Sequence, residues 1–288
     1  MSADLRPESG AALRTPGGAP PPTWVPALRI GTRPAVVLTI ASMAGLATFF
    51  WPLVIAAPTS GNTGAPFVFL AILPVLVVVG VAELSSGGLD SKAVAVLGVL
   101  AAVGAALRPL GAGTAGLETV FFLLVLAGRV FGPGFGFLLG ATTLFASALL
   151  TAGVGPWLPF QMIAAAWVGL GAGLLPGRGR LRGRAEIVVL CVYGAVSAQA
   201  YGLLMNMSGW PYGLAGTGTE LSYVPGSGPV ENLHRFLIYS VTTSSLGWDL
   251  GRAITNVVLI ALVGPAVLAA LRRAARRARF VERPARSR

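Results

Sequence analysis

Long apolar segments recur along most of this chain and limit its possible folds more than any other feature. A helix needs about 20 mainly apolar residues to cross the hydrocarbon core of a bilayer. Only 11% of the 288 residues are charged, against about 25% in an average soluble domain, so the apolar residues must run together. The sequence therefore predicts an all-α, polytopic membrane helical bundle. Eight windows qualify as transmembrane spans, at residues 34–56, 65–83, 92–107, 116–131, 135–152, 157–175, 186–207 and 249–271.

Positively charged residues gather in alternate connections of this predicted bundle, and therefore on one side of the membrane. Cytoplasmic connections of membrane proteins carry an excess of Lys and Arg. With the N-terminus inside and eight crossings, all 21 Lys and Arg residues fall on the cytoplasmic side except Arg108, Arg235 and Arg252. We therefore expect a multi-pass membrane protein with both ends of the chain in the cytoplasm.

Composition divides the chain into four parts. Residues 1–33 are rich in Pro, Gly and Arg and poor in large apolar groups, which predicts a disordered cytoplasmic tail. Residues 34–84 are expected to form two N-terminal transmembrane helices, and residues 85–273 a six-helix core. Residues 274–288 are expected to form a basic cytoplasmic tail.

The connection between the seventh and eighth predicted spans, residues 208–247, differs from the others in length and content. It contains many Gly, Pro and Ser residues, which interrupt long helices, together with aromatic residues. Long loops in compact proteins usually have a function. We expect an external loop that covers a pocket, with a helix at the membrane interface over 231–245.

The densest motif is GVGPWLPFQM, residues 153–162, at the external start of the sixth span. Pro156 and Pro159 restrict the backbone where the helix begins, and Trp157 offers a flat amphipathic face. Trp157 could also be only an interfacial anchor. The amide of Gln161 both donates and accepts hydrogen bonds, and it is costly in hydrocarbon when unpaired. Gln161 should therefore point into the bundle, towards a ligand or another helix.

Three further polar groups are predicted at the same depth, one at the end of the third span, one at the end of the seventh and one at the start of the eighth. In the last group, Asp249, Arg252 and Asn256 share one helix face because of their i, i+3, i+7 spacing. Intramembrane ionisable residues are functional candidates, although Asp249 and Arg252 could also only neutralise each other. We expect a concave external pocket for a small molecule, lined by Arg108, Trp157, Gln161, Asn206, Trp210, Trp248, Asp249 and Arg252.

Small residues form a stripe along the third predicted span. Gly98, Ala102 and Ala106 follow one another at intervals of four residues and therefore lie on one face of a helix. Helices in lipid associate through such residues because they allow close backbone approach. The stripe predicts either packing inside this protein or an interface with a partner membrane subunit.

Catalytic and metal-binding patterns are absent from the sequence. His234 is the only histidine and Cys191 the only cysteine, which excludes a His-containing metal triad and an internal disulfide. The chain has no Walker A motif, so ATP hydrolysis by that route would need other subunits. The net charge of +11 resides mainly in the tails and one short connection, which does not suit a nucleic-acid groove. We expect a transport protein that is not an enzyme and has no covalently bound cofactor.

Two sequence blocks carry a resemblance to a known family. LAGRVFGPGFGFLLG, followed by SALLTAGVGPWLPFQMIAAAWVGLGAGLLP, resembles the substrate-specific S components of energy-coupling factor (ECF) transporters, in particular the cobalamin-type branch. In that branch a glycine-flanked FGP turn precedes a GPW-x-P-x-QM helix start. The similarity is strongest over 126–176 and extends more weakly over 92–273. That range holds six spans, so the first two would be an N-terminal addition.

The resemblance implies a membrane-embedded substrate-binding subunit of an ATP-driven vitamin importer in a bacterial cell membrane. Such a subunit captures a vitamin in an outward-facing pocket and docks on a T transmembrane subunit with two cytoplasmic ATPase subunits. The same resemblance implies a T-subunit contact at Gly98, Ala102 and Ala106. It also implies a cobalamin or related corrinoid as the ligand, with Arg108 near an anionic group. Riboflavin or a queuosine precursor is the alternative within vitamin transport.

Two interpretations from other classes remain open at this point. The chain could be a membrane enzyme acting on a lipid, with Asp249 as the base and Arg252 holding a phosphate. A lone acid and arginine without a second acid, a histidine or a metal ligand make a sparse catalytic site. The chain could also be a structural scaffold, which would leave vitamin uptake unchanged in its absence.

Overall fold

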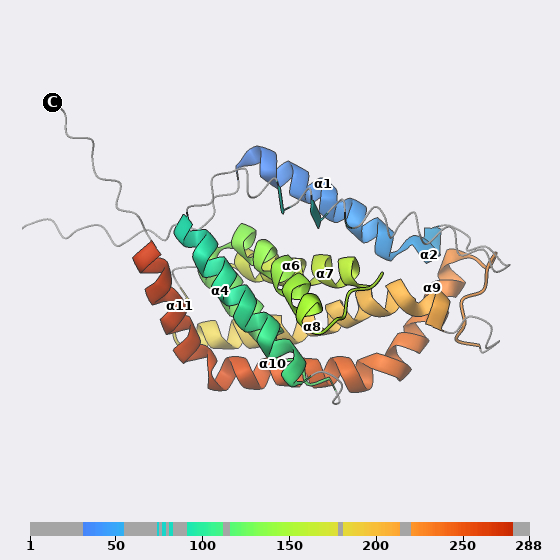
Figure 1. Ribbon diagram of the computed structural model, residues 1–288. Helices are drawn as coiled ribbons and strands as arrows, with labels where there is room; N and C mark the ends of the chain where they lie inside the picture. Colours follow the sequence, from blue (N-terminus) through green and yellow to red (C-terminus); the bar gives the residue numbers. More distant parts are fainter. Residues whose placement is uncertain are drawn as a thin grey trace, which may run out of the picture.

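The computed structural model of the chain is a bundle of α-helices (Figure 1). It describes residues 31–54, 74, 77–78, 81–82, 91–111, 116–177, 181–213 and 220–278, and within these residues there is no β-strand. The predicted all-α class is confirmed. In chain order the helices are α1 Thr32–Phe49, α2 Trp51–Val54, α4 Ser91–Leu107, the 3₁₀ turn η1 Arg108–Leu110, α5 Phe121–Phe131, α6 Pro133–Leu150, α7 Leu158–Leu174, α8 Arg184–Gly213, α9 Pro229–Ser240, the π-helical segment η2 Val241–Asp249, α10 Leu250–Leu262 and α11 Gly264–Ala278.

Helices α5, α6 and α7 form the centre of the bundle. Every residue of α5 is buried. Gly132, with a φ of 108°, turns the chain sharply from the end of α5 into α6, which begins at Pro133. Gly136 and Gly169 bring α6 and α7 together, because a Cβ atom on either would overlap the carbonyl oxygen of the other. The glycine-rich block of the sequence thus produces a tight turn followed by a close helix contact.

The predicted spans and the observed helices agree in part. Helices α1, α4, α6 and α8 are long and apolar enough to cross a membrane, and the bent segment from α9 to α11 would make a fifth span. Helices α5 and α7 are apolar but shorter. The 11 residues of α5 extend only about 16 Å, against a hydrocarbon core of about 30 Å. The predicted span 65–83 falls mainly outside the described residues, so the count of eight and the orientation stay predictions.

The connection at 208–247 contains more helix than the sequence suggested. Helix α8 continues to Gly213, and α9 begins at Pro229 and runs into η2. Pro229 does not prevent this, since a helix tolerates proline in its first turn, where the missing N–H has no partner in any case. The helix expected within 231–245 corresponds to α9 and the first half of η2.

Helices α9, η2 and α10 form one continuous arm that ends in a sharp bend. In η2 the hydroxyls of Thr242 and Thr243 donate to the carbonyls of Ile238 and Tyr239, at 2.8 and 2.6 Å, and so compete with regular helix bonding. After Val263 the chain bends by 68° into α11. Pro265 lacks the backbone N–H that would continue the hydrogen-bond ladder. The single span predicted at 249–271 is therefore two helices.

The N-terminal helix α1 packs on the core. Phe49 is fully buried, and its ring meets that of Phe160 edge-on with 5.0 Å between centroids. The indole N–H of Trp167 on α7 donates to the hydroxyl of Ser42 at 3.0 Å. The part of the chain expected to be an addition is thus joined to α7 by both apolar and polar contacts.

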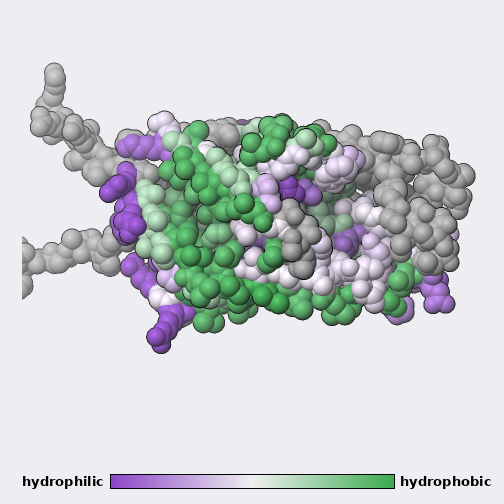
Figure 2. All heavy atoms as spheres, turned by 60° about the horizontal axis from the view of Figure 1, so that its bottom comes forward, coloured by the Kyte–Doolittle hydropathy of each residue, from purple (hydrophilic) through white to green (hydrophobic). Residues whose placement is uncertain are grey.

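The surface of the bundle separates into zones. Figure 2 shows apolar residues over the middle of the molecule and hydrophilic residues gathered at one end. We call this end, where α8 begins and α11 lies, the arginine-rich end, and the end that holds α9 the opposite end (Figure 1). The exposed arginines of the arginine-rich end are Arg182, Arg184, Arg273, Arg276 and Arg277.

Candidate functional site

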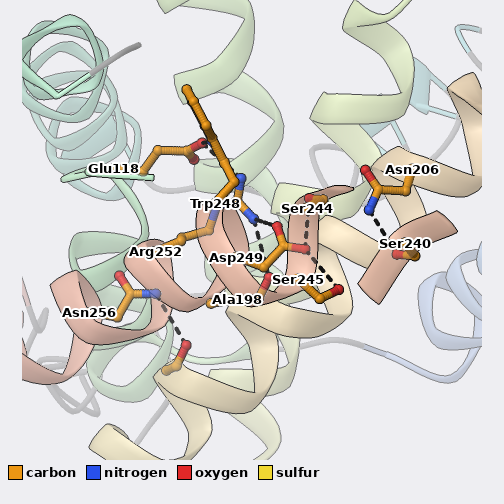
Figure 3. Close-up of polar contacts among 11 residues, drawn as sticks. Glu118, Ala198, Asn206, Ser240, Ser244, Ser245, Trp248, Asp249, Arg252 and Asn256 are labelled. Atoms are coloured by element: carbon orange, nitrogen blue, oxygen red, sulfur yellow. Dashed lines mark hydrogen bonds and ion pairs between the residues drawn. The ribbon is translucent and has the colours of Figure 1, made fainter. Parts of the chain in front are cut away.

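A polar cluster gathers around Arg252 at the start of α10. The guanidinium donates to the Asp249 carboxylate at 2.7 Å and to the Glu118 carboxylate at 2.9 Å (Figure 3). Glu118 also accepts a hydrogen bond at 3.4 Å from the indole of Trp248. Arg252 thus bridges two acids that are 131 residues apart in the sequence, one on its own helix and one on the segment before α5.

Asp249 is enclosed by hydrogen-bond donors. Only 1% of its side chain is exposed, and the hydroxyls of Ser244 and Ser245 on η2 donate to its carboxylate at 3.0 and 3.4 Å. The π-helical winding of η2 places these two hydroxyls on the side of Asp249, as Figure 3 shows. On α8, Gly202 faces this carboxylate, and a Cβ atom there would overlap it. Asp249 is therefore held in one position by α8 and η2 together.

Arg252 is equally confined. One guanidinium nitrogen reaches the carbonyl oxygen of Ala198 at 3.3 Å. The rings of Tyr201 and Phe121 lie with their centroids 5.1 and 5.7 Å from the guanidinium carbon, close enough for cation–π attraction. Arg252 and Asp249 therefore support the site from inside, whereas Glu118, with 20% of its side chain exposed, reaches the surface.

A second group of contacts joins α4, α6 and α7. Arg108, in the turn after α4, donates to the amide oxygen of Gln161 at 3.0 Å and to the hydroxyl of Ser147 at 3.4 Å. Gln161 points into the bundle, as the cost of an unpaired amide predicted. Both Arg108 and Gln161 are half-buried. Their hydrogen bond fixes the position of both side chains, and their partial exposure leaves them available to a ligand.

The segment 116–120 connects the two groups. The hydroxyl of Thr119 donates to the carbonyl of Leu107 at 2.6 Å, directly before Arg108. Gly116, with a φ of 78°, lies against the backbone of Trp248 and Arg252, where a side chain would not fit. We use the name polar cluster for Arg108, Glu118, Gln161, Trp248, Asp249 and Arg252.

Three predicted site residues lie outside this cluster. Asn206 on α8 donates to the Ser240 hydroxyl at 2.8 Å, one turn from the serines that hold Asp249 (Figure 3). Trp210 is fully buried, donates to the carbonyl of Leu221 at 2.8 Å, and packs against Met207 and Phe236 in a small apolar core under α9. Trp157 is 54% exposed, and its indole donates to the carbonyl of Gly153 in its own turn.

The small-residue stripe of α4 faces away from the bundle. Gly98, Ala102 and Ala106 are exposed, and a Cβ atom at Gly98 would meet nothing within 4 Å. The neighbouring Ala101 and Ala105 are buried and make the contact of α4 with the core. The stripe is therefore not used for packing within the described part of the chain.

Glu118 is the cluster member that sequence reasoning did not propose. It lies near the start of the predicted span 116–131, and a lone acid inside an apolar segment was the available signal. The serines of η2 carried no comparable signal, since a serine-rich connection resembles an ordinary loop. Within the described residues no group of three or more His, Cys, Asp or Glu side chains could hold a metal ion.

A second ion-pair cluster lies at the arginine-rich end and was also not predicted. Glu186 on α8 accepts a hydrogen bond at 3.0 Å from Arg129 on α5, and its two oxygens lie 2.7 and 2.6 Å from Arg272 on α11. Arg129 also donates to the carbonyls of Leu175 and Pro176, at 2.9 and 3.0 Å. The side chains of Arg129 and Glu186 are 1% and 2% exposed. This cluster joins α5, α8 and α11.

Comparison with known families adds to this geometry. The family model described as ECF transporter, substrate-specific component matches residues 92–264, more than half of the chain. Searches of curated proteins and of solved structures gave no match. The matched range runs from the start of α4 to the beginning of α11 and includes the whole polar cluster, whereas α1 and α2 lie outside it. The chain belongs to the substrate-specific components of ECF transporters, membrane subunits that work together with T and ATPase subunits.

Proposed function

We propose that this subunit captures a cobalamin or related corrinoid at the polar cluster, from the outer side of the cell membrane. The observation that carries the proposal is the hydrogen bond between Arg108 and Gln161. It joins the GPW-x-P-x-QM motif, which resembles the cobalamin-type branch, to the end of α4 beside the accessible Glu118. The motif thus contributes a side chain to a set of half-buried polar groups.

The charge balance of the cluster supports a ligand of low net charge. Two arginines, Arg108 and Arg252, are balanced by two acids, Glu118 and Asp249, so the site offers no excess charge to a strongly anionic ligand. A corrinoid carries several amide groups, which both donate and accept hydrogen bonds. Gln161, Asn206 and the guanidinium of Arg108 provide complementary donors and acceptors.

Exposed aromatic rings near the cluster would cover apolar parts of such a ligand. Trp248 is 40% exposed and keeps its indole N–H on Glu118, so its ring is held in place. Small-molecule sites usually combine apolar and aromatic walls with a few placed polar groups. In this proposal Asp249 and Arg252 position Trp248 and Glu118, while Trp210 stabilises α9 through its contact with Phe236.

Ligand identification tests the substrate. The full chain is purified in mild detergent, and co-purifying small molecules are identified by mass spectrometry. Cyanocobalamin is then titrated against the ligand-free protein, with riboflavin and a queuosine precursor as competitors. We expect a retained corrinoid and saturable cyanocobalamin binding that neither competitor displaces. Displacement by riboflavin or by the queuosine precursor would assign the site to that ligand instead.

We further propose that the exposed stripe of α4 is the docking face for the T subunit, which couples the chain to two ATPase subunits. The stripe, Gly98, Ala102 and Ala106, is exposed on the surface, and small residues allow close approach of a partner helix. Ala102→Leu should abolish co-purification of the T subunit while ligand binding persists. Ala200→Leu, at an exposed alanine on α8, is the matched control. Loss of ligand binding in Ala102→Leu would contradict this division of roles.

A further inference from the structure

Helix α11 has two faces of different character. Leu268 and Leu271 are buried against the bundle, where α11 packs on α5 and α10. Arg273, Arg276 and Arg277 are exposed, and no acidic residue in the described part of the chain pairs with them. Between these arginines and the bend, the exposed positions are alanines and Pro265. Helix α11 is thus an amphipathic helix with a cationic outer face.

On the inner face of α11, Arg272 forms an ion pair with the bundle. Arg272 contacts both oxygens of Glu186, and 35% of its side chain stays exposed. Glu186 is shared with the buried Arg129, so two arginines face one acid and the three side chains carry a net charge of +1. One guanidinium nitrogen of Arg129, Nη2, is buried without a hydrogen-bond partner. The buried Arg129 and Glu186 balance each other, so the excess charge resides on Arg272, where its partial exposure lets an anion at the surface neutralise it.

The position of α11 beside the apolar zone indicates which kind of anion would bind there. The helix follows the apolar α10 directly and leaves it at 68°, so it lies across the end of the bundle and does not continue away from it. In Figure 2 the hydrophilic residues of this end border the apolar middle zone. Basic residues directly beside a transmembrane helix attract anionic lipids.

We propose that the outer face of α11, formed by Arg273, Arg276 and Arg277, binds the headgroups of anionic phospholipids. Arg272 extends this face to Glu186 and Arg129, so a bound lipid phosphate also offsets the excess positive charge of the inner cluster. This site is separate from the polar cluster and does not depend on which vitamin is bound.

Lipid titration of the full chain in neutral detergent tests the proposal by native mass spectrometry. Phosphatidylglycerol and phosphatidylcholine are the two probes. The variant Arg273→Gln/Arg276→Gln removes two charges of the face, and Arg182→Gln/Arg184→Gln removes two exposed charges at the same end but outside α11. Each basic residue near an anionic surface contributes about 1 kcal/mol, or about a fivefold change in affinity.

We expect wild type to bind phosphatidylglycerol in preference to phosphatidylcholine. The α11 variant should weaken phosphatidylglycerol binding about 25-fold, and the control variant by much less. Equal loss in both variants would mean that only the total charge of this end matters and would overturn the site. Equal binding of the two lipids, or release of phosphatidylglycerol by inorganic phosphate at the same concentration, would overturn the choice of lipid.

Discussion

The described part of the chain has two buried ion-pair clusters, one at each end of the bundle's ion-paired helices, and they differ in which side chains they leave accessible. In the polar cluster one arginine, Arg252, lies between two acids, and one of them, Glu118, reaches the surface. At the arginine-rich end one acid, Glu186, lies between two arginines and is 2% exposed. The first cluster keeps an acid, an indole and a neighbouring amide accessible to a ligand. The second uses its single acid entirely to join α5, α8 and α11.

This comparison teaches that buried charge in a membrane bundle can serve two purposes. Breaking a buried ion pair is expensive, because the remaining charge is left without compensation. Where the shared acid is enclosed, as Glu186 is, it holds helices together and contributes to stability. Where one partner is exposed, the same arrangement can hold a binding group in place. Substitutions at the arginine-rich end should therefore lower mainly stability, whereas substitutions in the polar cluster should also lower ligand affinity.

The largest expected effect is at Glu186. Glu186→Gln leaves Arg129 buried without an anion and should lower the free energy of unfolding by about 3–5 kcal/mol. Thermal unfolding of the purified protein in detergent measures this loss. Glu231→Gln is the control, because Glu231 pairs with Arg235 in an exposed i, i+4 pair and should change stability by less than about 1 kcal/mol. Similar losses in both variants would remove the distinction between the buried cluster and a surface pair.

An intermediate effect is expected at Gly202 of α8. In Gly202→Ala the new methyl group would overlap the Asp249 carboxylate, so Asp249 must move. We expect a loss of about 1–3 kcal/mol in stability together with weaker ligand binding. Gly209→Ala on the same helix is the matched control, since a Cβ atom there meets nothing within 4 Å. Unchanged affinity in Gly202→Ala would show that Asp249 does not position the binding groups.

The smallest effect on stability, with a clear effect on binding, is expected at Gln161. Gln161→Ala removes the acceptor for Arg108 and a contact for the ligand. Ligand affinity should fall at least tenfold, while thermal unfolding shifts little because both side chains are half-buried. Gln199→Ala on α8, also half-buried, should keep full affinity. A large loss of stability without a change in affinity would make Gln161 a structural residue.

Sequence reasoning located most helices, but it did not locate their ends. The apolar windows correspond to α1, α4, α6 and α8, because long apolar runs depend only on local composition. The break at Val263 was missed, and of the helical arm at 229–249 only the part at 231–245 was expected. Both depend on which backbone groups neighbouring elements satisfy, and Pro and Gly residues mark either a loop or a helix end in the sequence alone.

The candidate site divides in the same way. The spacing of Asp249 and Arg252 predicted their contact, because residues three apart on a helix are always neighbours. The same sequence could not separate Trp210 from Trp248, since a buried aromatic in an apolar core and an exposed one beside a polar site have the same local pattern. The sequence also placed Arg108 and Gln161 at the same depth in the membrane, but it did not predict the hydrogen bond between them.

By itself the sequence determined that the protein is an all-helical membrane protein and which charged residues lie within or next to its apolar segments. Composition decides these properties, because apolar segments of this length are stable only in a lipid bilayer, and a segment in a bilayer must satisfy its backbone hydrogen bonds within a helix. Only the tertiary structure decided which charges meet. Arg252 reaches Glu118 across 134 residues, and Glu186 reaches Arg272 across 86, through packing of α8 against α10 and of α11 against α5. Such contacts depend on helix positions that no local pattern specifies.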